Sequence, residues 1–258
     1  MNRPDAVITS IKETTMVAIR NPFKRLFLFL ATLVLAAFAS TPAFAVDARI
    51  GKLFMNEGTC SASVVSGKNV IVTAAHCCWD RTSNGWTGGW SFAPGYQDGK
   101  APYGVFQWED ARVPNSWINN GDIASDVCLI KLKDDAAGHP VTYYTGWLGR
   151  SWNYGAAQHM RSFGYPGNIG GANSQESCTG ESSAQPAGCG GDVLNMACKM
   201  TYGSSGGPWI RDYGSGDHVD STVHGYVSQS CTGTFGDAFD GPRFTSNNIA
   251  MLCTAEGC

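Results

Sequence analysis

Residues 203–208 read GSSGGP, and the interpretation of the whole chain starts from this stretch. Ser205 has a glycine two positions before it and glycines at the next two positions. Glycine is typical of places where the backbone turns sharply or lies close to a neighbour. A sharp turn would expose the Ser205 hydroxyl and leave backbone N–H groups free to bind a substrate oxyanion. A plain Gly/Ser surface turn is the alternative, because the chain contains 32 glycines.

A serine hydroxyl is a poor nucleophile near neutral pH, so it needs a histidine to accept its proton and a carboxylate to orient that histidine. The chain offers both residue types upstream of Ser205. His76 ends an apolar run at residues 70–75, and Asp126 precedes a second run at residues 127–132. Each alone is more typical of a structural histidine or a turn aspartate. The three together indicate nucleophilic catalysis.

Three segments carry these residues: TAAHC at 73–77, DVCLIKL at 126–132 and GSSGGP at 203–208. They resemble, in the same order, the three signature segments of the chymotrypsin-like (trypsin-like) serine peptidases. The resemblance covers roughly residues 50–258. The short first strands and the GYPG segment at 164–167 look more like the bacterial branch that includes the glutamyl endopeptidases.

The resemblance implies a secreted serine endopeptidase that hydrolyses peptide bonds through an acyl-enzyme intermediate, acts on protein or peptide substrates and needs no cofactor. Ser205 would be the nucleophile, His76 the general base and then acid, and Asp126 the group that orients His76. The backbone N–H groups of Gly203 and Ser205 would form the oxyanion hole. Asp122 is a rival for the acid because it begins a DIA segment that also resembles the family. Asp126 is preferred, since the full alternating strand follows it in the family's register.

Many short apolar runs separated by turn residues favour an all-β fold. The family resemblance implies two six-stranded antiparallel β-barrels with the active site between them. The N-terminal barrel would span about 50–135 and the C-terminal barrel about 140–258. Strands are expected at 50–65 (two strands), 70–75, 105–113, 127–132, 161–165 and 223–228, a surface turn at 114–120, and a short C-terminal helix at 244–252.

The first 45 residues have the pattern of a secretory signal peptide. The basic pair KR at 24–25 precedes a 14-residue apolar run, and AFA at 43–45 fits a cleavage site. A membrane span would need about 20 apolar residues. We therefore expect residues 46–258 to form the mature peptidase domain, secreted or periplasmic, with the start of translation open between Met1 and Met16.

Charge excludes some partners. Residues 1–45 carry five of the 18 basic and two of the 21 acidic residues, which leaves 13 basic and 19 acidic residues in the rest of the chain. No basic patch indicates nucleic-acid binding, and no long apolar segment remains after signal removal to indicate a membrane partner. A monomer is expected. No metal site is indicated, because no CxxC pair occurs and the five histidines are scattered.

All ten cysteines lie after residue 45, and an even number in an exported chain predicts disulfides. Spacing alone does not assign the pairs. The resemblance implies a bridge between Cys60 and Cys77, with Cys78 as the competitor of Cys77. Two further pairs are expected, one that braces the substrate pocket and one that closes a local loop: Cys198–Cys231 and Cys178–Cys189. No partner is assigned to Cys78, Cys128, Cys253 and Cys258.

The substrate pocket is interpreted from two positions. Lys199 falls where trypsin has its pocket base, and a lysine there would favour acidic substrate side chains. Glutamyl endopeptidases carry a pocket histidine on the strand after the nucleophile. Here the aligned residue is Val227, followed by Ser228, and His224 lies three positions away.

Ser204 stands where the family often has an aspartate that receives a new N-terminus on activation. Without this acid a freed Ile50 ammonium would have no acceptor. We therefore expect no N-terminal ion-pair switch and expect Ile50 inside the first strand.

Two other functions are kept as alternatives. Residues 203–207 also fit the G-x-S-x-G nucleophile elbow of α/β-hydrolases such as esterases and lipases, in which the acid and the histidine follow the serine. His218 and His224 would be the histidine candidates, but the strand–helix alternation of that fold is missing. The second alternative is a catalytically impaired relative that acts as a secreted binding protein.

Overall fold

The structure is a computed structural model that describes residues 45–186, 192–226 and 238–258. Residues Val46–Cys258 form one compact unit. The expected signal peptide falls almost entirely outside the described residues and stays a prediction. No helix in the described part is long and apolar enough to cross a membrane.

The first half of the described chain forms a closed barrel, with strand order β1-β2-β3-β8-β7-β6. Strand β3 consists entirely of β-branched residues, which fit a pleated, buried surface. The two strands expected at 50–65 and the strands expected at 70–75, 105–113 and 127–132 are confirmed. The barrel strands are β1 (Ile50–Met55), β2 (Gly58–Ser66), β3 (Val70–Thr73), β6 (Ser91–Pro94), β7 (Phe106–Arg112) and β8 (Cys128–Leu132).

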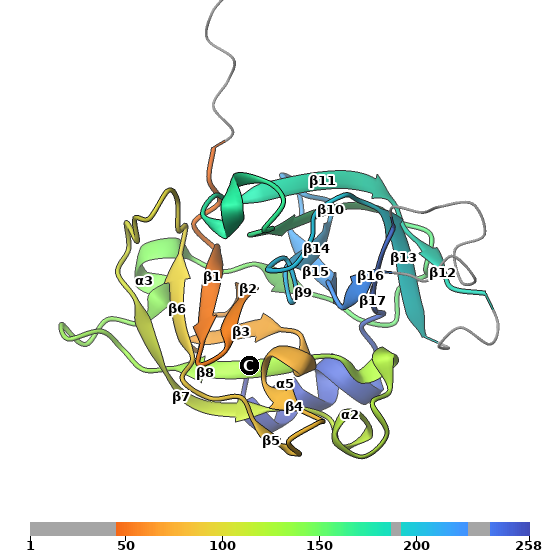
Figure 1. Ribbon diagram of the computed structural model, residues 1–258, viewed down its shortest axis with the longest axis horizontal. Helices are drawn as coiled ribbons and strands as arrows, with labels where there is room; N and C mark the ends of the chain where they lie inside the picture. Colours follow the sequence, from red (N-terminus) through yellow and green to blue (C-terminus); the bar gives the residue numbers. More distant parts are fainter. Residues whose placement is uncertain (1–44, 187–191, 227–237) are drawn as a thin grey trace, which may run out of the picture. The chain divides into compact units, whose positions relative to one another are not determined.

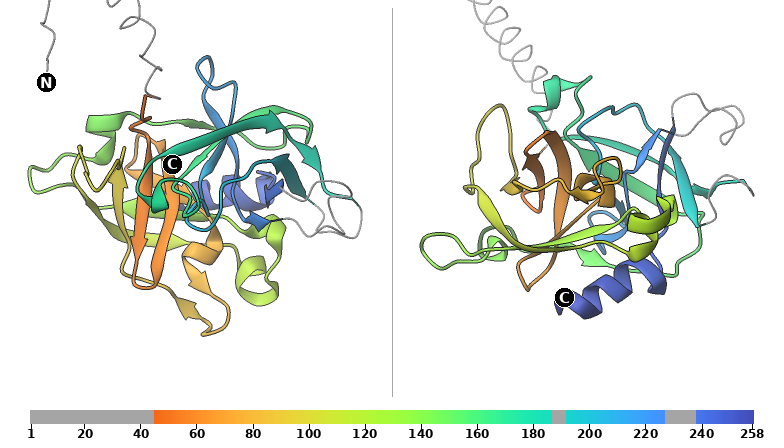
Figure 2. Two further views of the ribbon diagram at one scale, coloured as in Figure 1. Left: turned by 45° about the horizontal axis from the view of Figure 1, so that its top comes forward. Right: turned by 60° about the horizontal axis from the view of Figure 1, so that its bottom comes forward.

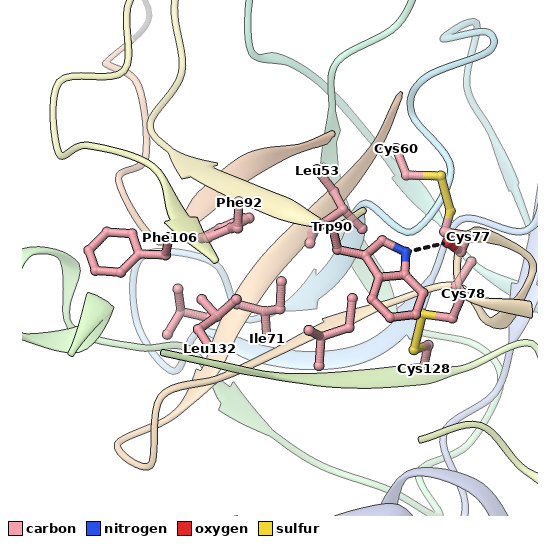
Figure 3. Close-up of a cluster of buried hydrophobic side chains, with 14 of the residues drawn as sticks. Leu53, Cys60, Ile71, Cys77, Cys78, Trp90, Phe92, Phe106, Cys128 and Leu132 are labelled. Carbon is pink, nitrogen blue, oxygen red and sulfur yellow. Dashed lines mark hydrogen bonds between the residues drawn. A yellow bond between two sulfur atoms is a disulfide. The ribbon is translucent and has the colours of Figure 1, made fainter. Parts of the chain in front are cut away.

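The barrel core lies beside the short 3-10 helix η1 (Ala75–Cys77), which follows β3. Figure 3 shows Trp90 in this core, where its indole N–H donates to the Cys77 carbonyl at 3.0 Å. Two disulfides, Cys60–Cys77 and Cys78–Cys128, tie the end of η1 to β2 and to β8. Hydrophobic packing and covalent links therefore fix the backbone on both sides of His76.

The second half is built from two sheets, a five-stranded one in the order β11-β10-β14-β15-β9 and a four-stranded one in the order β12-β13-β17-β16. Among the described residues these strands do not form a second closed six-stranded barrel, so that closure stays a prediction. The strands are β9 (Gly149–Arg150), β10 (His159–Gly164), β11 (Glu176–Glu181), β12 (Ser183–Ala184), β13 (Val193–Ala197), β14 (Pro208–Arg211), β15 (His218–Thr222), β16 (Gly225–Tyr226) and β17 (Ala238–Pro242). A separate two-stranded sheet pairs β4 (Trp79–Asp80) with β5 (Gly85–Trp86).

Three segments of the described chain are α- or π-helical. The expected C-terminal helix is confirmed as the π-helical turn η4 (Ser246–Ala250) followed by α5 (Met251–Glu256), which packs against β8 (Figure 2). A short helix that the sequence analysis did not identify, α3 (Val141–Thr145), follows the barrel. The turn expected at 114–120 is wrong, because this segment forms α2 (Asn115–Asn120). Burial of Trp117 anchors α2, and Gly121 ends it in the left-handed conformation.

Two expected disulfides are wrong. Cys178 on β11 bonds to Cys198, just after β13, so neither residue can pair with Cys189 or Cys231 as expected. Cys189 and Cys231 themselves lie outside the described residues. The error has a physical reason: a nearby cysteine suggests a local loop, but the folded chain brings β11 and β13 together. A fourth disulfide joins Cys253 to Cys258 at the end of the chain.

Candidate active site

His76 and Asp126 form a close pair at the edge of the barrel. His76 Nδ1 lies 2.8 Å from Asp126 Oδ2, and the His76 backbone N–H donates to Asp126 Oδ1 at 2.7 Å. Asp126 is fully buried where the 3-10 helix η2 (Ile123–Ser125) ends. An ionised carboxylate only accepts hydrogen bonds, so Nδ1 carries the proton and Nε2 of the neutral ring is left as an acceptor. This arrangement prepares His76 to act as a base.

The charge on Asp126 is stabilised within the site. Burial alone would raise the pKa of Asp126, but the charge of His76 and the hydrogen bonds from His224 and His76 hold this pKa well below its usual range. Asp122, the rival acid, is exposed and instead caps η2 by accepting from Ala124 N and Ser125 Oγ. The structure therefore brings Asp126, and not Asp122, to His76.

The GSSGGP stretch is packed closely against its neighbours, unlike a free surface turn. Gly203 has a φ of 95°, and a Cβ at this position would lie 2.4 Å from the Tyr165 carbonyl oxygen. Gly206 has a φ of 76°, and a Cβ there would lie 2.0 Å from Thr73 Oγ1. Both positions combine the left-handed conformation with a lack of space, and only glycine meets both conditions.

Ser61 on β2 fixes the loop that carries Ser205. The Ser61 hydroxyl donates to the Gly203 carbonyl at 2.8 Å and accepts from the Tyr165 N–H at 2.9 Å. Its backbone N–H donates to the Ser205 carbonyl at 2.7 Å. The preceding residue, Cys60, is bonded to Cys77, which directly follows His76. One strand therefore positions both the histidine and the serine loop.

The backbone N–H groups around Ser205 are of two kinds. Ser204, Gly206 and Gly207 donate to Thr201 O, Val223 O and Ser204 O. For Gly203 and Ser205 no acceptor occurs within the described part of the chain. These are the two N–H groups that the family resemblance assigns to an oxyanion hole.

A cleft of about 640 Å³ contains these groups, and its lining includes His76, Gly203, Ser205, Tyr202 and His224. Among the described residues no hydrogen bond joins Ser205 to His76. In unliganded enzymes such bonds are often long and shorten only when substrate binds. The cleft has the size of a ligand pocket and exposes both partners on one surface.

The expected pocket residues receive little support. Lys199 is exposed and does not belong to the described lining of the cleft. Val227 and Ser228 lie outside the described residues. Ile50 begins β1 and is fully buried, as expected. Ser204 is also buried, and its hydroxyl donates to the Thr201 carbonyl at 2.6 Å.

His224 has a place in the site that the sequence analysis missed. Its Nδ1 hydrogen-bonds to Asp126 Oδ2, the same oxygen that binds His76. The only sequence signal was its position at the start of the strand expected beside the pocket. Its proximity to Asp126 depends on the pairing of the two halves, which local sequence does not reveal.

Metal-ligating atoms also occur here. One nitrogen each from His76 and His224 and one Asp126 oxygen lie within 4.8 Å of one another. These atoms already hydrogen-bond to each other, so a metal ion would have to replace those bonds. A second group, Cys60, His76 and Cys77, has its two sulfurs in a disulfide and offers no thiolate.

A barrel whose edge holds a His–Asp pair beside a cleft serine is the architecture of a serine peptidase. Residues 60–215 match the family model described as "Trypsin-like peptidase domain". The chain belongs to this trypsin-like peptidase family and is a serine endopeptidase. The all-β fold also removes the α/β-hydrolase alternative, which requires a different architecture.

Solved structures agree with this assignment. The protease Anisep from Arthrobacter nicotinovorans is 26% identical with a TM-score of 0.72, over 82% of this chain and 96% of that one. The thermostable serine protease AL20 from an extremophilic microorganism is 29% identical with a TM-score of 0.72, over 82% and 98%. A Glu endopeptidase, 20% identical with a TM-score of 0.68 over 85% and 95%, supports the fold alone. The comparison with curated proteins gave no match.

Proposed function

We propose that this endopeptidase cuts peptide bonds with Ser205 as nucleophile, His76 as general base and Asp126 as the group that orients His76. The observation that carries this proposal is the double contact of Asp126 with the His76 backbone N–H and ring Nδ1, beside a cleft shared with Ser205. This contact fixes both the ring orientation and the tautomer of His76.

The reaction follows from these positions. Ser205 Oγ attacks the carbonyl carbon of the substrate while His76 Nε2 takes the hydroxyl proton, and Asp126 stabilises the imidazolium that forms. The N–H groups of Gly203 and Ser205 bind the oxyanion, and the loss of one such donor typically costs about 10²- to 10³-fold in kcat. His76 then protonates the leaving amine, and water hydrolyses the acyl-enzyme by the same steps.

Labelling with a fluorophosphonate probe tests the proposal, because the probe reacts with an activated serine. We expect the wild-type protein to be labelled and Ser205→Ala to lose the label. Ser204→Ala is the matched control, since the adjacent hydroxyl is buried against the Thr201 carbonyl, and it should keep the label. An unlabelled wild-type protein that still binds peptides would support the binding-protein alternative.

We also propose that the protein is exported. Disulfides persist in oxidising compartments, so the disulfides of the described residues fit a secreted or periplasmic protein. N-terminal sequencing of exported protein should begin at Val46.

The expected preference for acidic side chains loses its support from Lys199. A peptide panel that varies only the residue before the cleaved bond measures the preference directly.

A further inference from the structure

We propose that His224 is a positioning residue that holds Asp126 together with His76 and, when protonated, places a positive charge beside the His76 ring. The proposal rests on the proposed roles of Ser205, His76 and Asp126. It assigns to His224 two separable effects: a hydrogen bond that orients the carboxylate, and a positive charge that repels a second positive charge on the neighbouring ring.

The backbone fixes His224 beside the serine loop. The preceding residue, Val223, accepts from the Gly206 N–H at 2.8 Å and donates to the Gly207 carbonyl at 2.9 Å. The His224 N–H donates to the Asp240 carbonyl on β17 at 2.8 Å. Because Val223 and His224 are both held by backbone hydrogen bonds, the position of the His224 side chain is fixed beside the serine loop.

The hydrogen bonds around Asp126 identify the positioning effect. Asp126 Oδ2 receives the Nδ1–H groups of both His76 and His224, and Oδ1 receives the His76 backbone N–H. The two imidazole rings meet edge to face at 5.5 Å between centroids, and Trp117 packs beside both, at 6.4 Å from His76 and 6.1 Å from His224. A buried carboxylate held by three donors has little freedom to rotate away from His76.

The charged groups that face His224 explain why it holds a proton. In the described part of the chain these groups are Asp126 after η2, Asp240 on β17 and His76 on η1. Burial lowers the pKa of His224, but the hydrogen bond and charge of Asp126, together with the charge of Asp240, more than offset this and raise it above the ordinary histidine value. His224 therefore carries its proton at a pH where an isolated histidine would be losing it.

A proton on His224 opposes a second proton on His76, because like charges about this far apart repel. His76 must be unprotonated to act as the base, so His224 extends activity towards acid pH. Replacing His224 with a neutral residue removes the repulsion. The acid limb of the pH profile of activity should then move to higher pH by about one unit. The shift is no larger because solvent reaches part of the site and weakens the repulsion between the two rings.

Two variants separate the two effects. In His224→Asn the side-chain N–H replaces the ring Nδ1–H towards Asp126 but cannot carry a charge. In His224→Ala both are lost. We expect kcat on the alkaline plateau to be near wild type for His224→Asn and to fall about tenfold for His224→Ala, the loss of one hydrogen bond to a charged group. Both variants should show the upward shift of the acid limb.

His159→Gln is the matched control, since His159 also bonds a carboxylate, Glu181 at 2.6 Å, but at an exposed position outside the described cleft lining. Its pH profile should equal that of the wild type. Rates are normalised to the fraction of protein that fluorophosphonate labels at completion, so misfolded protein does not count. Proton NMR adds a direct signature: two far-downfield imidazole N–H signals in the wild type and one in His224→Asn.

The outcomes are distinguishable. A wild-type protein that fluorophosphonate does not label contradicts the proposed function itself. A labelled enzyme whose acid limb is unchanged in both His224 variants overturns the charge effect. Equal kcat in His224→Asn and His224→Ala overturns the positioning effect, as would a single downfield signal in the wild type.

Discussion

At the scale of single residues, Asp126 is the group on which the site depends most. It is fully buried, and it is bound by the ring Nδ1 of two histidines and by one backbone N–H. A buried carboxylate normally resists ionisation, so its lowered pKa reflects the donors around it. Asp126 therefore fixes the tautomer of His76 and also supplies the negative charge that faces both histidines.

The choice between the two candidate acids gives a direct prediction. Asp126→Asn should lower kcat by about 10⁴-fold, because an amide side chain stabilises the wrong tautomer of His76. Asp122→Asn should leave kcat near that of the wild type, since Asp122 only caps η2. Steady-state kinetics on one peptide substrate compares the two. A large loss in Asp122→Asn with a tolerated Asp126→Asn would reverse the assignment.

Part of the candidate site could be predicted from the sequence. His76, Asp126 and Ser205 could be found because each ends or precedes a pattern that the family shares. His224 could not be placed, because its contact with Asp126 depends on how residues about a hundred positions apart meet in space. The pairing of Cys178 with Cys198 was missed for the same reason.

At the scale of elements, the glycine-rich turn packs so closely against the barrel that Gly206 has no space for a side chain. A Cβ on Gly206 would meet Thr73 Oγ1 at 2.0 Å, the Ser61 carbonyl at 2.5 Å and the Ala74 nitrogen at 2.7 Å. Two of these atoms belong to the backbone and cannot move aside. The turn is therefore specified by steric contact with β2 and the end of β3 as well as by its own conformation.

A pair of alanine substitutions separates the effect of steric contact from the effect of backbone conformation. Gly214 also has a positive φ, 89°, but its Cβ would meet nothing within 4 Å. Gly214→Ala should therefore lower the free energy of unfolding only by the backbone strain, about 1 kcal/mol. Gly206→Ala adds the clash and should cost at least about 2 kcal/mol more, with loss of activity. Denaturant unfolding measures both, and equal losses would contradict a steric role for the turn.

Local patterns predicted the strands better than the helices. Strands such as Val70–Thr73 are apolar runs bounded by turns, and both features are visible in the sequence. The helix α2 lacks a helical apolar stripe and depends on one buried side chain, Trp117. Trp117 packs against His76 and His224, which belong to other elements, so the local sequence does not predict this helix.

At the scale of the whole molecule, covalent links should contribute to stability according to the loop that each closes. Cys78 and Cys128 are 50 residues apart, whereas Cys253 and Cys258 are five apart. In the chain-entropy model these bridges stabilise the fold by about 4 and about 2 kcal/mol. We expect the double alanine variant at Cys78 and Cys128 to unfold at clearly lower denaturant concentration than the variant at Cys253 and Cys258. The reverse order would show that native-state effects outweigh chain entropy.

The hydrogen bonds of Ser61 have a consequence for when the protein becomes active. The first barrel carries His76 and Asp126, while the serine loop belongs to the second half and is fastened to the barrel through Ser61. A chain with only its first barrel folded holds a base without a nucleophile. With the proposed catalytic roles, activity therefore requires both halves to be folded and joined, and we expect a chain that lacks the second half to have no peptidase activity.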